Sequence, residues 1–97
     1  MTEATIDALA TAVDPTIIDV REPHEYRDMH VSGAVNVPLG DLRGRRGHIP
    51  DAHPVYVMSD CGKRSAEGAQ ILTEHGHDAV SVRGGMAEWM TSGHPTT

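Results

Sequence analysis

The chain has 97 residues, no phenylalanine and a formal net charge of -6, so it has room for one small domain with an aliphatic core. Its 14 acidic against 8 basic residues argue against a nucleic-acid partner or an anionic membrane surface. No apolar run could span a membrane, and the first residues lack the basic region of a signal peptide. A lone cysteine cannot form an internal disulfide, so a cytoplasmic setting is expected.

Strand and helix patterns alternate along the whole chain. The apolar, β-branched runs predict strands over residues 16–20, 34–37, 54–58 and 79–82. Helical spacing predicts helices over residues 5–12, from Pro23 onward, over 65–75 with Gly76 as its C-terminal cap, and after Gly84-Gly85. We expect one domain over 1–97, with loose termini at 1–4 and 96–97.

Strands that are apolar on both faces and alternate with helices predict an α/β fold. In such a fold a mostly parallel central sheet is covered by helices on both faces. Ligands then bind at the carboxyl ends of the strands. Three loops leave strands at that edge, after Val20, after Met58 and after Val82.

The loop after Met58 carries the most chemistry. It is a candidate anion-binding loop formed by Ser59, Asp60, Cys61, Gly62, Lys63, Arg64 and Ser65. Amides of a tight loop that enters a helix, together with the helix dipole, favour anions and would stabilise a thiolate. Cys61 is therefore either a reactive sulfur or an ordinary small residue.

Two other anion-binding motifs fail on spacing, and metal binding is weakly indicated. A nucleotide phosphate loop needs a glycine where Val57 stands, and a cysteine phosphatase loop needs an arginine where Glu67 stands. Seven scattered histidines and one cysteine give no clustered ligand spacing. No metal and no cofactor are predicted.

The segment IIDVREPHEYRDMHVSGAVNVP, residues 17–38, resembles the first sequence motif of rhodanese-like domains. The matching positions are Asp19, Val20, Arg21, Glu25, Tyr26, His30, Val31, Gly33, Ala34, Asn36, Val37 and Pro38. Met29 stands where the family often has glycine. The segment VRGGMAEWMTSGHP, residues 82–95, is similar to the family's closing Gly-Gly and Trp motif, so the resemblance covers most of the chain.

The resemblance implies a rhodanese-like fold with its active-site loop after residues 54–58. In active members, the cysteine that begins this loop takes sulfane sulfur from thiosulfate or a persulfide and passes it to cyanide or a thiol. Gly62, Arg64 and Ser65 match the Gly, Arg and Ser of the family loop, which places Ser59 at the nucleophile position. Placing Cys61 there instead would lose the match to the Gly and the Arg.

Serine cannot store sulfur as a persulfide, so sulfur transfer would have to use Cys61. The catalytic candidates are therefore Cys61 and Ser59, the latter as the position of the family nucleophile. The alternative is a catalytically inactive rhodanese-like module, with a natural or engineered Ser59, for anion sensing or protein binding. The expected partner is a small sulfur-containing anion such as thiosulfate, or a thiol or persulfide protein.

Several charged residues have structural interpretations beside functional ones. Asp19 and Arg21 are expected to support the site as a hydrogen-bonded ion pair, although Arg21 could border the pocket. Arg64 either orients the loop through backbone carbonyls or contacts the donor anion. Arg43, Arg45 and Arg46 belong to a loop that is either solvated or widens the positive field around a donor.

Overall fold

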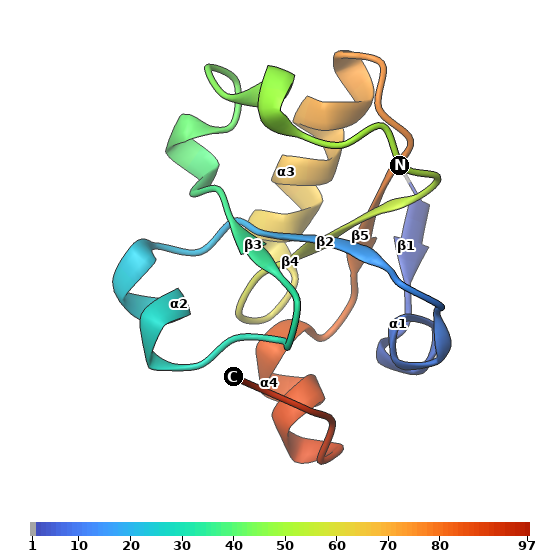
Figure 1. The fold of residues 1–97 in the computed structure, drawn as a ribbon, viewed down its shortest axis with the longest axis vertical. Helices are drawn as coiled ribbons and strands as arrows, with labels where there is room; N and C mark the ends of the chain where they lie inside the picture. The colour runs from blue at the N-terminus through green and yellow to red at the C-terminus, as the bar shows by residue number, and fades with distance from the viewer. Residues whose placement is uncertain (1) are drawn as a thin grey trace.

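A single five-stranded sheet organises the chain (Figure 1). The computed structural model describes residues 2–97, apart from the side chain of Arg46. The strands are β1 (Thr2–Ala4), β2 (Thr16–Asp19), β3 (Val35–Asn36), β4 (Val55–Met58) and β5 (Ala79–Val82). Their order is β1-β5-β4-β2-β3, and every neighbouring pair is parallel. The predicted parallel α/β fold is confirmed.

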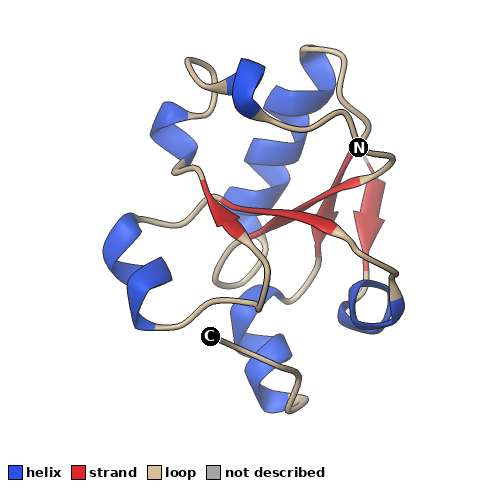
Figure 2. Ribbon diagram, in the orientation of Figure 1, coloured by secondary structure: helices blue, strands red, loops and turns tan. Residues whose placement is uncertain are grey.

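Helices connect the strands and cover both faces of the sheet (Figure 2). They are α1 (Ile6–Thr11), α2 (Pro23–Asp28), α3 (Lys63–Glu74) and α4 (Gly85–Thr91), with 3-10 turns η1 (Leu39–Asp41) and η2 (Arg46–His48). Gly76 has a φ of 91° and caps α3, because its N–H and that of His77 bond to carbonyls of the last helical turn. The predicted cap is confirmed.

Alternation along the strands divides the core into two clusters. Ile18, Val55 and Val57 face α3, where they pack with Leu72 and other aliphatic side chains. The intervening positions face α1 and α4, and this second cluster contains Ile17, Met58, Val82 and Trp89. Because side chains alternate across a strand with a period of two, β2, β4 and β5 each contribute to both clusters.

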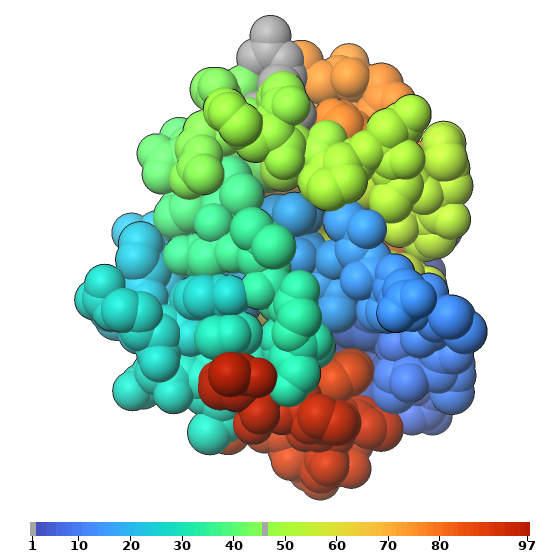
Figure 3. Space-filling model, in the orientation of Figure 1, coloured from blue at the N-terminus to red at the C-terminus, as the bar shows by residue number. Residues whose placement is uncertain are grey.

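The expectation of loose termini is wrong for the described residues. Residues 2–4 form the edge strand β1, paired to β5 from Thr2–Val80 to Ala4–Val82. At the other end, Thr97 and His30 exchange two backbone hydrogen bonds of 2.8 and 3.1 Å. Figure 3 shows the red C-terminal residues lying against the teal segment near residue 30. Both ends are held by backbone pairing, which an apolar pattern does not reveal; Met1 lies outside the described residues.

The parallel sheet brings the ends of β2, β4 and β5 to one edge. The Val20 N–H donates to the Met58 carbonyl at 3.0 Å just where β2 and β4 end. The segments that follow these strands are therefore neighbours, as the sequence predicted. Among residues 2–97, no helix has the length and apolarity to cross a bilayer.

Candidate functional site

The loop from Ser59 to Gly62 joins the buried strand β4 to the first turn of α3. Gly62 is the N-cap residue of α3 with a φ of 105°, a conformation that side chains rarely adopt. The first amides of a helix have no intrahelical acceptor, and the dipole of the 12-residue α3 adds positive potential at this end. The loop therefore has the backbone geometry that favours an anion.

Ser59 lies at the base of the loop. It is 1% exposed, and its Oγ accepts a hydrogen bond of 3.1 Å from the Gly62 N–H. Its carbonyl accepts a second bond, of 2.9 Å, from the Met86 N–H at the start of α4. The residue is thus fixed through both its side chain and its backbone.

The β5–α4 turn holds the loop from the other side. The Ala87 N–H donates to the Asp60 carbonyl at 3.0 Å. Gly85 has a φ of 54°, and a Cβ added there would lie 2.6 Å from the Asp60 carbonyl oxygen. Only a glycine allows the backbone of α4 to approach the loop this closely. The predicted Gly84-Gly85 turn is therefore a support for the loop.

Two buried hydroxyl groups fix the loop at the point where it enters α3. The Ser65 hydroxyl donates to the Gly62 carbonyl at 3.0 Å, and its Oγ lies 2.8 Å from the Ser81 Oγ in β5. Since the Ser65 proton points to Gly62, the Ser81 hydroxyl donates to Ser65. Sequence reasoning missed Ser81, because a serine inside an apolar strand gives no sign of its partner.

Cys61 lies on the opposite, solvent side of the loop. It is a free, exposed cysteine, and its neighbours Asp60 and Lys63 are also exposed. The two candidate nucleophile positions therefore differ in surroundings: Ser59 is buried and hydrogen-bonded, whereas Cys61 is open to any molecule that reaches the loop.

Arg64 pairs with Glu25 of α2 rather than with the loop carbonyls. Its Nη1 and Nη2 donate to the two carboxylate oxygens of Glu25 at 2.7 and 2.9 Å. These bonds lower the pKa of Glu25 to about 2, while burial opposes the shift and the Glu22 N–H assists it. Glu25 also raises the pKa of Arg64. The pair connects α2 to the first turn of α3.

Asp19 and Arg21 form a buried ion pair at the end of β2. The Arg21 Nη2 lies 2.8 Å from the Asp19 Oδ2, and the side chains are 7% and 0% exposed. The Arg21 Nη2 also donates to the Met29 carbonyl at 2.7 Å, while the Arg21 N–H donates to the Asp19 carboxylate. The expected hydrogen-bonded ion pair is present. It fixes the chain between β2 and α2.

A hollow of about 420 Å³ lies beside the loop. Its charged lining residues are Arg21, Glu25, Asp28 and Asp60, and its apolar ones are Met29, Met86 and Met90. It is thus bounded by the segment after β2, by the loop itself and by α4. Arg21 borders this hollow, one of the two roles that the sequence left open.

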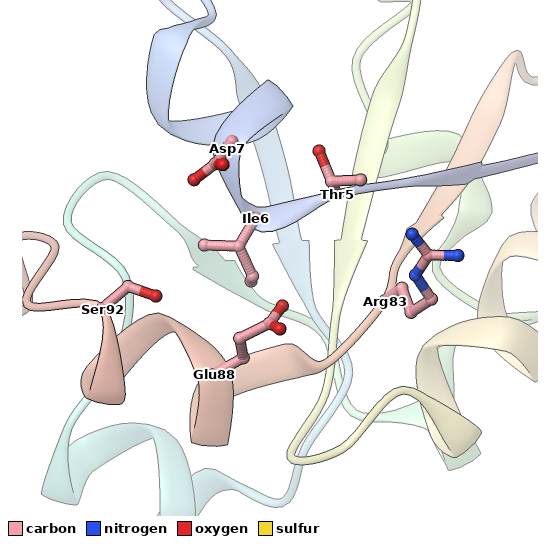
Figure 4. Close-up of a pocket in the computed structure, with 6 residues that line it drawn as sticks. All are labelled: Thr5, Ile6, Asp7, Arg83, Glu88 and Ser92. Atoms are coloured by element: carbon pink, nitrogen blue, oxygen red, sulfur yellow. The ribbon is translucent and has the colours of Figure 1, made fainter.

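A second hollow, of about 280 Å³, lies near α1 (Figure 4). Arg83 and Glu88 line it from the β5–α4 segment, and Thr5 and Asp7 line it from the start of α1. None of the predicted site residues lines it. Within residues 2–97, no three His, Cys, Asp or Glu side chains gather into a group that could hold a metal ion.

Comparison with known proteins gives a consistent family match. The model of the rhodanese-like domain matches residues 2–92. The thiosulfate sulfurtransferase PspE of Escherichia coli is 37% identical over 73 residues, which cover 73% of this chain and 70% of that protein. A rhodanese-related protein from Thermoplasma volcanium has a TM-score of 0.93 at 26% identity, covering 100% of this chain and 98% of its own.

Two relatives from Bacillus subtilis are longer than this chain. The uncharacterized protein YqhL is 38% identical over 74 residues, covering 75% of this chain and 59% of its own length. The putative sulfur carrier protein YrkF is 32% identical over 92 residues, covering 90% of this chain and 50% of its own. The chain therefore spans only 59% and 50% of the length of these two relatives.

Proposed function

The chain belongs to the rhodanese-like domain family, and from this membership we propose that it is a sulfurtransferase domain that carries sulfane sulfur on Cys61. The observation that carries the proposal is the position of the chain's only thiol. Cys61 is exposed on the loop that precedes α3, two residues beyond the buried Ser59. A serine oxygen cannot form a persulfide, so Cys61 is the one side chain here able to accept sulfur.

The proposed reaction has two balanced steps. The Cys61 thiolate attacks the outer sulfur of thiosulfate, a new S–S bond forms, and the S–S bond of thiosulfate breaks as sulfite leaves with its electron pair. An acceptor thiolate then attacks the outer sulfur of the Cys61 persulfide, and the Cys61 thiolate leaves. A protein or small-molecule persulfide can replace thiosulfate as donor, with a thiolate as leaving group.

The loop supports these anionic species through its backbone. Cys61 directly precedes the N-cap residue Gly62, so the positive end of the α3 dipole lies close by. Thiolate and persulfide are both stabilised by such a field. Because the second step consumes a thiol, the proposed setting is a reducing compartment such as the cytoplasm.

A second candidate function follows from Ser59. The position that begins the loop in active family members is occupied here by a buried hydroxyl that accepts a hydrogen bond from Gly62. This arrangement supports a module that binds an anion or a protein without transferring sulfur. The two candidates differ in one property, namely whether Cys61 gains sulfur.

Intact-mass spectrometry after incubation with thiosulfate, or with glutathione persulfide, tests the proposal. We expect the chain to gain one sulfur atom that a reductant removes, and we expect Cys61→Ala to gain none. Because Cys61 is the only cysteine, the added mass has one possible site. Circular dichroism of Cys61→Ala checks that the fold is intact.

A matched variant separates the two candidates. Ser59→Cys combined with Cys61→Ala moves the single thiol to the base of the loop. If the unaltered chain gains no sulfur from either donor, the proposal is wrong. If the double variant then gains it, the domain is a silenced rhodanese scaffold, as the second candidate requires.

A further inference from the structure

The hollow beside the loop has an acidic and thioether-rich lining that indicates its occupant. We propose that it is the docking site for a basic, cysteine-containing segment of a partner protein, which exchanges sulfur with Cys61. The inference rests on the proposed function, because it names the partner of that same reaction. The inference is based on the position of the hollow, on the charges of its lining residues and on its three methionines.

The position comes first. Asp60 is one of the lining residues, and Cys61 is the next residue in the chain. The opposite walls come from α2 and from α4, whose Met90 is 50% exposed. Cys61 does not itself line the hollow, so a segment bound there would reach the exposed thiol by extending past Asp60.

The arginine that lines the hollow and the arginine that pairs with the lining Glu25 already have carboxylate partners inside the chain. Arg21 is paired with the buried Asp19, and Arg64 is paired with Glu25 through two hydrogen bonds. The carboxylates of Asp28 and Asp60 remain, and neither has an ion pair among the described residues. Lys63 is not among the lining residues.

The net charge of the lining follows from its residues. One arginine and three acidic side chains leave a charge of -2 around the hollow. The chain as a whole carries -6, so the local field and the overall field have the same sign. Approach of a small dianion is slowed by such a field, whereas approach of a basic segment is accelerated. A second copy of this acidic chain is repelled for the same reason.

The apolar part of the lining favours a peptide over an inorganic ion. Met29 is 37% exposed and Met90 is 50% exposed, while Met86 is buried. Methionine side chains are flexible and polarizable, so they adapt to aliphatic groups of different shape. Thiosulfate and sulfite gain nothing from such contacts, but a segment with an aliphatic residue next to its cysteine does.

Binding of two matched synthetic peptides tests the docking without any sulfur chemistry. Each has a central serine in place of cysteine, a leucine on either side and a fluorescent label. One ends in two lysines on each side and the other in two glutamates. By fluorescence anisotropy at low salt we expect the lysine peptide to bind at least about tenfold more tightly, and we expect added salt to reduce the difference.

Variants locate the site. In the double variant Asp28→Asn and Asp60→Asn, we expect the preference for the lysine peptide to fall at least about threefold. The control Glu74→Gln removes one charge at the far end of α3, where Glu74 meets Arg43 only at 4.0 Å. It should keep the preference. Equal binding of the two peptides, or a preference that survives in the double variant, would overturn the proposal.

The cysteine versions of both peptides connect docking to the reaction. With Cys61 loaded with sulfur, we expect the lysine peptide to remove it at least about tenfold faster than the glutamate peptide. Equal rates would show sulfur transfer without this docking site and would overturn only the docking. If Cys61 cannot be loaded by any donor, the proposed function fails while the serine peptides still report on the hollow.

Discussion

The two sides of the loop between β4 and α3 differ in how firmly they are held. On the inner side, Ser59, Gly62 and Ser65 bond to one another, and further bonds reach α4 and Ser81 of β5. On the outer side, Asp60, Cys61 and Lys63 are exposed. The residues of the inner side determine the shape of the loop, and the residues of the outer side, including the Cys61 thiol, are open to solvent.

This difference explains how the loop can keep its form without a thiol at its base. A hydroxyl at position 59 accepts the Gly62 N–H, and the carbonyl of the same residue accepts the Met86 N–H. Neither bond requires a sulfur atom. Changes to the inner side should therefore affect stability, and changes to the outer side should affect function alone.

The largest effect is expected at Gly85, the closest approach on the inner side. In Gly85→Ala the new Cβ would meet the backbone of Ser59 and Asp60, so α4 must move and lose its bonds to both carbonyls. We expect a loss of roughly 3 kcal/mol in the free energy of unfolding. Urea denaturation measures it. Gly40→Ala is the control, because a Cβ at Gly40 meets nothing within 4 Å; equal losses in both variants would contradict this account.

A smaller effect on stability is expected at Glu25 of α2, which bonds to Arg64 in the first turn of α3. Its pKa is about 2 in the folded chain against 4.5 for a free side chain, so the carboxylate stabilises the fold above pH 4.5. That contribution is lost as the pH falls from about 4.5 to about 2. Because the pair is partly exposed, Glu25→Gln should cost about 1 kcal/mol at neutral pH.

Denaturation of the unaltered chain and of Glu25→Gln across this pH range provides the measurement. The difference in the free energy of unfolding should shrink as the pH falls. A difference that stays constant down to pH 2 would mean that the pair with Arg64 does not stabilise the fold.

The smallest effect on stability is expected at Cys61 itself. Its side chain is exposed, so Cys61→Ala should change the free energy of unfolding by less than about 0.5 kcal/mol. Thermal denaturation under reducing conditions tests this. A loss comparable to that in Gly85→Ala would show that Cys61 helps to hold the loop in shape, as the residues of the inner side do.

Much of the scaffold was predictable because it follows from local patterns. The β-branched run at residues 16–20 and the apolar run at 54–58 became β2 and β4, and Gly84-Gly85 became a turn with positive φ values. The edge strand β1 was missed, since two of its three residues are polar side chains exposed to solvent. Its pairing with β5 is a tertiary property.

The sequence predicted which loop forms the site, but it did not predict which residues of that loop are buried and which are exposed. The position of Ser59 and Cys61 on the loop follows from register, while their opposite exposures depend on how α4 and β5 pack against it. Arg64 and Glu25 are 39 positions apart, so nothing in a local pattern indicates that they pair. The three methionines of the hollow come from α4 and the end of α2, and only the fold brings them together.

The pair of Glu25 and Arg64 has a mechanical consequence for the hollow. Since it joins α2 to the start of α3, it links the acidic wall directly to the helix that follows the thiol-bearing loop. The methionine wall on α4 has several rotatable bonds in each side chain and can change its contour. Such a surface discriminates strictly by the position of charge and only loosely by side-chain volume. Many segments of different sequence would fit it, provided that their positive charges fall in the same places.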